Sequence, residues 1–294
     1  MTIAQTIDPP RYSLAHLTII DVPTPELVRI AYRTGYDFVS PRLICDGLPG
    51  RDYSLSRDDD LLRSTVRALA ETGLPVHDIE LARIADGLDP ATYESDLAIG
   101  AELGARHLIS SVWTHDHSYA VDAFGRLCRL AAQYDLTVNL EWVPIAAVST
   151  MSAALEVIAA VNEPNARLMV DLHHFHRSRE RLADLDAIPA GLFSVAQICD
   201  APAEIPTDPN EMTRIIREGR SYLGEGGIDP AAILARMPQC VYSIELPNSA
   251  AVARWGAEGH ARRCLETARE YLEGQPDIES IVGVRAASMT RWRS

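Results

Sequence analysis

Residues 136–171 read LTVNLEWVPIAAVSTMSAALEVIAAVNEPNARLMVD and contain two short apolar runs, 136–141 and 167–171, each closed by an acidic residue. Such runs are typical of buried strands, and the segment between them is long enough for a helix. The two strand ends lie about thirty residues apart, which is the length of one strand-helix unit with short loops. This stretch therefore predicts two neighbouring parallel strands joined by a helix.

The same unit repeats on both sides of this stretch. Apolar residues recur at three- and four-residue spacing in 92–103 and 119–134, which predicts helices there. Eight strands are predicted, at 13–19, 36–40, 76–80, 107–110, 136–141, 167–171, 193–198 and 241–246. Eight strands alternating with helices favour a single closed (β/α)8 TIM barrel over an open doubly wound sheet. No G-x-G-x-x-G sequence follows the first strand, so a dinucleotide-binding fold is not supported.

No Pro/Gly/Ser-rich linker, charge block or low-complexity tract divides the 294 residues. We therefore expect an N-terminal arm at 1–12, one barrel catalytic domain at 13–273 and a C-terminal tail at 274–294. The tail is partly apolar, so packing on the barrel, packing on a partner subunit and a frayed end all stay open, and with them a homo-oligomer.

Acidic residues dominate the charge of the chain, with 41 Asp and Glu against 27 basic residues and a formal net charge of -14. This charge would repel nucleic acid and anionic membranes, so neither is an expected partner. All basic residues are arginine, which excludes chemistry that needs a lysine amine.

The five cysteines form no C-x-x-C pair, and neither a signal peptide nor an apolar stretch of about 20 residues is present. We expect a cytoplasmic protein with reduced thiols.

Four polar residues occur at or near the ends of predicted apolar strands. Glu141, Asp171 and Glu245 follow such runs, and Gln197 lies within 193–198. The carboxyl ends of the strands form the active site of a TIM barrel, so the four side chains should meet at one mouth. Three buried carboxylates repel one another unless they are paired or bind a cation. We interpret the four as ligands of one divalent cation rather than as separate partners of rim arginines. Their oxygen donors suit Mn²⁺ or Mg²⁺ better than Co²⁺ or Zn²⁺.

Five motifs resemble, in order and spacing, those of the xylose isomerase-like sugar phosphate isomerase/epimerase superfamily. They are LEWVP at Glu141, VDLHHFHRS at Asp171, AQICDAP at Gln197, GEGGID at Glu225 and SIELPN at Glu245. The resemblance spans nearly the whole chain. It implies a TIM-barrel enzyme with one divalent metal ion and a small polyhydroxy carbonyl substrate.

The resemblance also implies catalytic roles. In that family the glutamates matching Glu141 and Glu245 act as acid and base on opposite faces of a ketose. The histidine matching His174 contacts the substrate or donates a proton to it, although a rim histidine bonded to a carboxylate is the alternative. The position of Gln197 is usually His, and the family's dehydroshikimate dehydratases are similar to this chain in having Gln before an acidic D-A-P sequence.

Further residues are candidates for substrate binding because the sequence places them near the same mouth. Glu80 closes a predicted strand and either binds a substrate hydroxyl or pairs with Arg83 or Arg42. The other candidates, each of which has a structural alternative, are His16, Trp113, His115, Arg177 and Arg220.

These residues predict a metal-dependent isomerase or epimerase that acts on a ketose, keto-polyol or related hydroxy-ketone. Proton abstraction next to the carbonyl would give a metal-stabilised enediolate. Return of the proton gives epimerisation or isomerisation, whereas loss of a β-hydroxyl gives dehydration. The alternatives are a lyase of the 3-dehydroshikimate dehydratase type and a non-catalytic barrel that binds a small polyol. The net charge disfavours an endonuclease of this fold.

Overall fold

The structure is a computed structural model that describes residues 9–44 and 53–274 of the chain. Eight strands lie in the described residues. They are β1 (Tyr12–Ala15), β2 (Phe38–Ser40), β3 (Asp78–Ile84), β4 (His107–Val112), β5 (Thr137–Glu141), β6 (Ala166–Asp171), β7 (Phe193–Ile198) and β8 (Val241–Ile244). Each of them overlaps a strand expected from the sequence.

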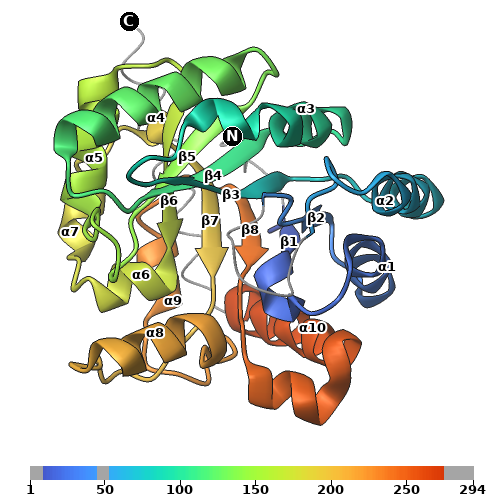
Figure 1. Ribbon diagram of the computed structural model, residues 1–294. Coiled ribbons are helices and arrows are strands. Elements are labelled where there is room, and N and C mark those ends of the chain that lie inside the picture. The colour runs from blue at the N-terminus through green and yellow to red at the C-terminus, as the bar shows by residue number, and fades with distance from the viewer. Residues whose placement is uncertain (1–8, 45–52, 275–294) are drawn as a thin grey trace, which may run out of the picture.

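Helices connect the strands and surround the sheet (Figure 1). The α-helices are α1 (Thr24–Thr34), α2 (Asp59–Thr72), α3 (Glu94–Glu102), α4 (His117–Ala132), α5 (Met151–Val161), α6 (Leu172–Arg177), α7 (Leu182–Leu185), α8 (Pro209–Glu218), α9 (Pro230–Leu234) and α10 (Ser249–Glu273). The 3-10 segments are η1 (His16–Ile19), η2 (Pro90–Tyr93) and η3 (Ala190–Leu192). Many α-helices begin where a polar side chain accepts a backbone N–H of the first turn, as at Asp58, Asp116, Thr150, Asp208, Asp229 and Asn248.

Neighbouring strands are parallel and follow the order β2-β1-β8-β7-β6-β5-β4-β3. The two ends of this order meet, because bridges at Val39–Val76 and Arg42–Glu80 join them. The backbone N–H of His77 also donates to the Val39 carbonyl at 3.0 Å. The sheet is therefore a closed barrel, and the predicted TIM barrel is confirmed.

Side-chain alternation along the strands decides what faces the barrel interior. Leu108 and Leu168 belong to the large apolar cluster that includes the surrounding helices. The next residues, Ile109 and Met169, belong to a separate small cluster and point to the opposite, inner face. Asp171 lies two residues after Met169, so this alternation directs it into the barrel as well.

The ends of four strands differ from those predicted, and one of them is β4, which runs to Val112 instead of ending at residue 110. The strand predicted at 13–19 ends at Ala15 and continues as η1, and β8 ends at Ile244, one residue before Glu245. The strand predicted to close at Glu80 runs on to Ile84, with a register shift between Ile79 and Ala82. For β1, apolar composition does not distinguish the strand from the 3-10 segment, because most residues of both are buried.

The described residues include only a small part of the predicted N-terminal arm and C-terminal tail. Residues 1–8 of the predicted arm and 275–294 of the predicted tail lie outside the described residues, so these boundaries stay a prediction. Among the helices that the structure describes, none has the length and apolar character needed to cross a membrane.

His16 explains why the chain leaves the sheet after Ala15. Its Nε2 lies 2.8 Å from the Val22 carbonyl, and its Nδ1 lies 3.3 Å from the backbone nitrogen of Arg42. Because that N–H must donate, Nδ1 accepts and Nε2 carries the proton, so the buried ring is neutral and has both nitrogens satisfied. Burial, together with the nearby Arg42 charge, lowers the pKa of His16 to about 4, against a partial rise from the Val22 hydrogen bond.

This environment predicts a pH dependence of stability. Between pH 6.5 and about 4 the unfolded chain protonates His16 whereas the folded chain does not, so the free energy of unfolding falls as pH falls, by up to about 1.4 kcal/mol per pH unit. His16→Gln should remove this part of the slope in urea unfolding measured at pH 7, 6 and 5. His117→Gln, at an exposed position at the start of α4, is the matched control. An unchanged slope in His16→Gln would contradict the assignment.

Candidate active site

Four polar side chains meet at the end of the barrel toward which the strands run. Glu141 ends β5, Asp171 ends β6, Gln197 lies in β7 and Glu245 directly follows β8. All four are buried. In Figure 1 the arrowheads of β6, β7 and β8 point to this end, where α8 and α10 lie. The structure therefore brings together at one mouth the four residues predicted as metal ligands.

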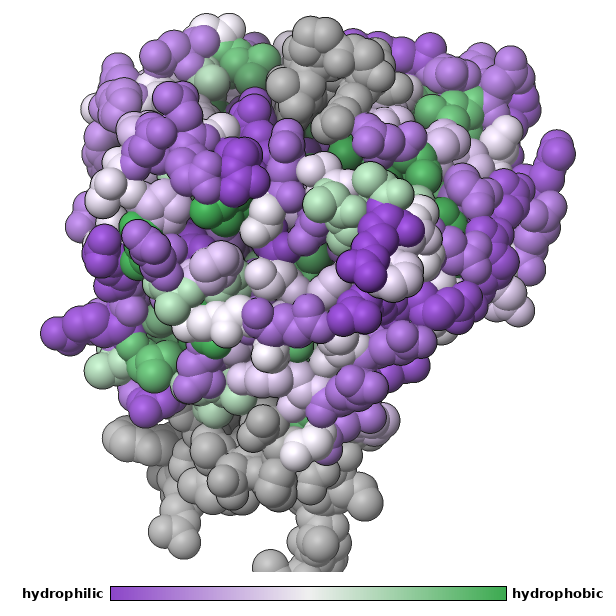
Figure 2. All heavy atoms as spheres, turned by 90° about the horizontal axis from the view of Figure 1, so that it is seen from below, coloured by the Kyte–Doolittle hydropathy of each residue, from purple (hydrophilic) through white to green (hydrophobic). Residues whose placement is uncertain are grey.

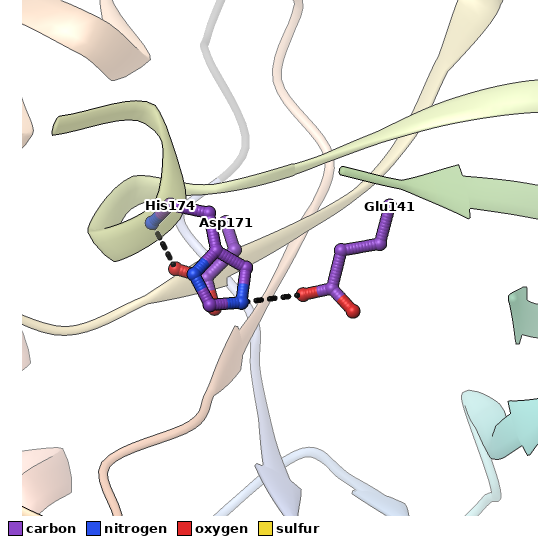
Figure 3. A group of neighbouring side chains, drawn as sticks. All are labelled: Glu141, Asp171 and His174. Carbon is purple, nitrogen blue, oxygen red and sulfur yellow. Dashed lines mark hydrogen bonds and ion pairs between the residues drawn. The ribbon is translucent and has the colours of Figure 1, made fainter. Parts of the chain in front are cut away.

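Glu141, Asp171 and His174 form the tightest group. Each offers a ligand atom, and these atoms lie within 4.8 Å of one another. The Nε2 of His174 lies 3.3 Å from Glu141 and 3.8 Å from Asp171 (Figure 3). Asp171 also accepts the backbone N–H groups of His173 and His174 at 2.6 and 3.2 Å, which starts α6 immediately after β6. One carboxylate thus both belongs to the group and orients the helix that carries His174.

Arg220 joins Asp171 to Glu245 from the other side. Its Nη1 lies 2.7 Å from Asp171, and its Nη2 lies 2.9 Å from Glu245. The same guanidinium donates to the carbonyls of Glu245 and Ile216. Arg220 is buried yet lines the cavity described below.

Glu80 and Gln197 form a third part of the site. Arg42 pairs with Glu80 at 2.9 Å and lies 4.0 Å from Glu245. Of the two partners predicted for Glu80, the structure therefore pairs it with Arg42. The amide nitrogen of Gln197 donates to Glu80 at 3.1 Å, while the buried amide oxygen of Gln197 has no hydrogen-bond partner among the described residues.

These contacts fit a divalent cation. Arg42 and Arg220 pair with Glu80, Asp171 and Glu245, whereas Glu141 lies beside His174. Burial of all four carboxylates as anions beside these groups would leave an excess of negative charge. The unpartnered oxygen of Gln197 adds a neutral donor of the kind that Mg²⁺ and Mn²⁺ bind. Charge and donor type therefore both agree with a divalent ion beside these residues.

The same crowding shifts the pKa values of the site. Burial is the largest cause for each group. It raises the pKa of Glu245 to about 8 against the Arg220 charge, and that of Glu80 to about 7 against Arg42. For Asp171 the charges of Arg220 and His174 outweigh burial and lower the pKa. For His174 the Asp171 and Glu141 carboxylates outweigh burial and raise it.

A cavity of about 770 Å³ opens above these groups. Five of the predicted site residues line it: Glu141, His174, Glu245, Trp113 and Arg220. Figure 2 looks onto this end of the molecule, where hydrophobic residues lie recessed between hydrophilic ones. The cavity therefore gives a small molecule access to both predicted catalytic glutamates.

Other predicted substrate-binding residues lie elsewhere. His16 is behind the cavity wall, where it fixes η1, and His115 is exposed outside the lining. Arg177 is buried in α6 and donates to the Pro202 carbonyl at 2.9 Å. Glu80 lies beneath the cavity, bonded to Arg42 and Gln197. In this structure none of these four side chains lines the cavity, because each is turned toward protein partners or toward solvent.

Three arginines that line the cavity, Arg42, Arg83 and Arg217, were not predicted as site residues. Arg42 reaches Glu80 and Glu245, and Arg83 lies over the ring of Trp113, with 5.1 Å from its guanidinium carbon to the ring centroid. Arg83 is two residues after Leu81 of the inner cluster. Alternation along β3 could therefore have placed it on the inner face.

Asp200 accounts for two of the sequence motifs, AQICDAP and GEGGID. Its carboxylate accepts four backbone N–H groups at 2.7–3.1 Å, those of Ala201, Gly224, Gly226 and Ile228. Its backbone also pairs with that of Ser221 in both directions, at 2.9 and 2.7 Å. A Cβ at position 226 would lie 2.2 Å from the Asp200 carboxylate, so only glycine fits. Asp200 thus fastens the loop that carries Arg220.

The chain is similar in sequence to a known protein family. The model of a family described as xylose isomerase-like TIM barrel matches residues 28–268. The chain belongs to this family. The resemblance drawn from the five motifs is thereby confirmed.

The individual relatives have low sequence identity to this chain. It is 29% identical over 136 residues to an inosose isomerase of Bacillus subtilis (strain 168), a match that covers 43% of this chain and 46% of that protein. A crystal structure of the IolI protein with a bound zinc atom has a TM-score of 0.73 at 19% identity, over 90% of this chain and 98% of that one. A probable 3-DHS dehydratase, AsbF of Bacillus anthracis, has a TM-score of 0.67 at 16% identity, over 88% and 98%. At these identities the structural likeness establishes the fold.

The Asp200 contacts predict a specific stability loss. Asp200→Asn keeps the size of the side chain but replaces an acceptor oxygen with a donor, so buried N–H groups lose their partner at about 1–3 kcal/mol each. We expect the free energy of unfolding, measured in urea, to fall by about 3 kcal/mol. Asp208→Asn is the matched control, because Asn caps a helix as well as Asp does. Equal stability of the two variants would contradict the role of Asp200.

Proposed function

We propose that this protein is a divalent-metal-dependent isomerase or epimerase that moves a proton on the carbon next to the carbonyl of a hydroxy ketone. The observation that carries the proposal is that Glu141 and Glu245 line one cavity from strands that are not neighbours, since β6 and β7 lie between β5 and β8. Two carboxylates placed in this way can face a bound carbon from different sides.

Glu245 is the proposed acid. Burial raises its pKa to about 8 against the Arg220 charge, which favours the protonated form that can give a proton to a carbanion when Glu245 is not bound to the cation. Glu141 faces the cavity with His174 3.3 Å away and is the proposed base. Removal of a proton by one glutamate and delivery of another by the second inverts the carbon that lies between them.

His174 and Arg220 complete the proposed machinery. The Asp171 and Glu141 carboxylates raise the pKa of His174 against burial, which favours the protonated ring that can donate to a substrate oxygen. Arg220 holds Asp171 and Glu245 in place through contacts of 2.7 and 2.9 Å, and Asp200 fastens its loop. A buried guanidinium also lowers the energy of negative charge that develops nearby.

Glu141, Asp171, Gln197 and Glu245 are the proposed metal ligands, and the position of His174 makes its Nε2 a further candidate. When bound, a divalent cation acidifies the carbon between a ketone and a hydroxyl and stabilises the resulting negative charge. Mn²⁺ and Mg²⁺ suit the oxygen donors, whereas a histidine ligand would favour Zn²⁺ or Co²⁺.

The substrate class is proposed from the relatives. The matched region of the B. subtilis protein belongs to an inosose isomerase, and an inosose is a cyclic polyhydroxy ketone. We extend this class to the present chain and assign the reaction to the cytoplasm. Dehydration is the second candidate, because His174 lies 3.3 Å from the proposed base and, when protonated, can give its proton to a departing hydroxyl.

Solvent isotope exchange tests the proposal. Purified protein with Mn²⁺, Mg²⁺, Co²⁺ or Zn²⁺ is mixed with inososes, ketohexoses and 3-dehydroshikimate in D₂O, and deuterium next to the carbonyl is followed by NMR. We expect exchange with at least one ketone, and loss of a β-hydroxyl would identify the lyase.

Glu141→Gln and Glu245→Gln should each slow exchange by roughly 10²–10⁴-fold. Glu225→Gln, which alters an exposed ion pair with Arg263, is the control. Activity within about tenfold of wild type in either site variant would contradict the assignment of Glu141 and Glu245 as base and acid.

Removal of the metal should destabilise the protein. Without a cation the buried carboxylates repel one another, so EDTA should lower the melting temperature, and excess Mn²⁺ after dialysis should restore it. Elemental analysis before and after chelation shows whether an ion was removed. The same melting curve for protein that has lost its metal would contradict a shared site.

A further inference from the structure

The cavity is larger than a sugar-sized substrate needs. Its volume is about 770 Å³. At roughly 30 Å³ for each water-sized group, this space holds about 25 such groups, whereas a ketohexose has about 12 non-hydrogen atoms. Roughly half of the cavity therefore remains to be filled when a monosaccharide lies against Glu141 and Glu245.

Most of the side chains that line the part of the cavity formed by residues 17–22 and the start of α10 are apolar, and Thr18, Asp21 and Ser249 line it as well. We call this part the apolar arm, and six of its apolar side chains are Leu17, Ile20, Val22, Val252, Ala253 and Ala257. Segment η1 and helix α10 are packed side by side, as Figure 1 also shows. None of the six side chains is fully buried, so apolar surface is presented to the cavity instead of being covered by the protein itself.

The apolar arm and the catalytic groups are parts of one cavity. Glu245 follows β8, and α10 begins four residues later at Ser249, so the chain leads directly from one proposed catalytic residue to the arm. The polyhydroxy part of a substrate satisfies the carboxylates and arginines at the barrel mouth, but it gains nothing from aliphatic side chains. A ligand that fills the whole cavity must be polar at one end and apolar at the other.

We propose that the substrate is a polyhydroxy ketone that carries an apolar substituent, such as an aryl or alkyl glycoside whose sugar ring bears the ketone, with the substituent in the apolar arm. This inference rests on the proposed function for the polar half of the ligand. It adds the chemical class of the other half and the residues that select it. Each methylene buried in the arm strengthens binding about fourfold, so a phenyl group should strengthen it by tenfold or more.

Binding of unreactive ligands tests the inference independently of turnover. Methyl and phenyl β-glucoside, which have no ketone, are titrated into the metal-loaded protein by calorimetry. The phenyl compound should bind at least tenfold more tightly. Ala253→Gln places a polar group in the arm at an exposed position where it does not disturb the core, and it should abolish this preference. Ala250→Gln is the matched control, since Ala250 is exposed on the same helix but lies outside the cavity. That variant should keep the preference.

Equal affinity for the two glucosides, no binding of phenyl glucoside at millimolar concentration, or a preference that survives Ala253→Gln would each overturn the inference. The isotope-exchange experiment distinguishes this failure from failure of the proposed function. Exchange on an unsubstituted ketone together with equal glucoside affinities would leave the reaction supported and remove only the apolar substituent.

Discussion

Mutual repulsion among buried carboxylates is the constraint around which the barrel mouth is arranged. Glu80, Glu141, Asp171 and Glu245 come from four different strands and share one small volume. Each would be expensive to bury alone. Arg42 and Arg220 offset part of this charge, and His174 lies between two of the acids. The remaining negative charge is the reason that we propose a cation and proton transfer at this mouth.

Much of this arrangement can be read from local sequence, because it depends on strand periodicity. An apolar run closed by an acid identifies both the strand and the residue at its mouth, which is why Glu141 and Asp171 are found where expected. The roles of Arg220 and His16 could not be predicted in this way. Arg220 meets Asp171 across 49 positions of sequence, and the ring of His16 meets the backbone of Arg42 across 26. No short window contains such pairs.

Polar and aliphatic side chains at the barrel mouth come from different elements of the chain. Residues on β5 to β8 supply carboxylates and an amide, which suit cation binding and proton movement. Residues 17–22 and the start of α10 supply aliphatic surface, which suits neither. The proposed reaction and the proposed selection of substrate thus depend on separate parts of the chain, so one can change while the other is kept. Family membership alone therefore does not identify the substrate.

The loop held by Asp200 bears on how relatives of this chain are recognised. Two of the five motifs that carry the family resemblance contain Asp200 and the glycines that its carboxylate contacts. Identical residues at these positions reflect how the loop is held. A chain that shares them is therefore expected to share this loop structure, whatever reaction it catalyses. Transfer of an activity between such chains is sound only when it is based on the side chains that line the cavity.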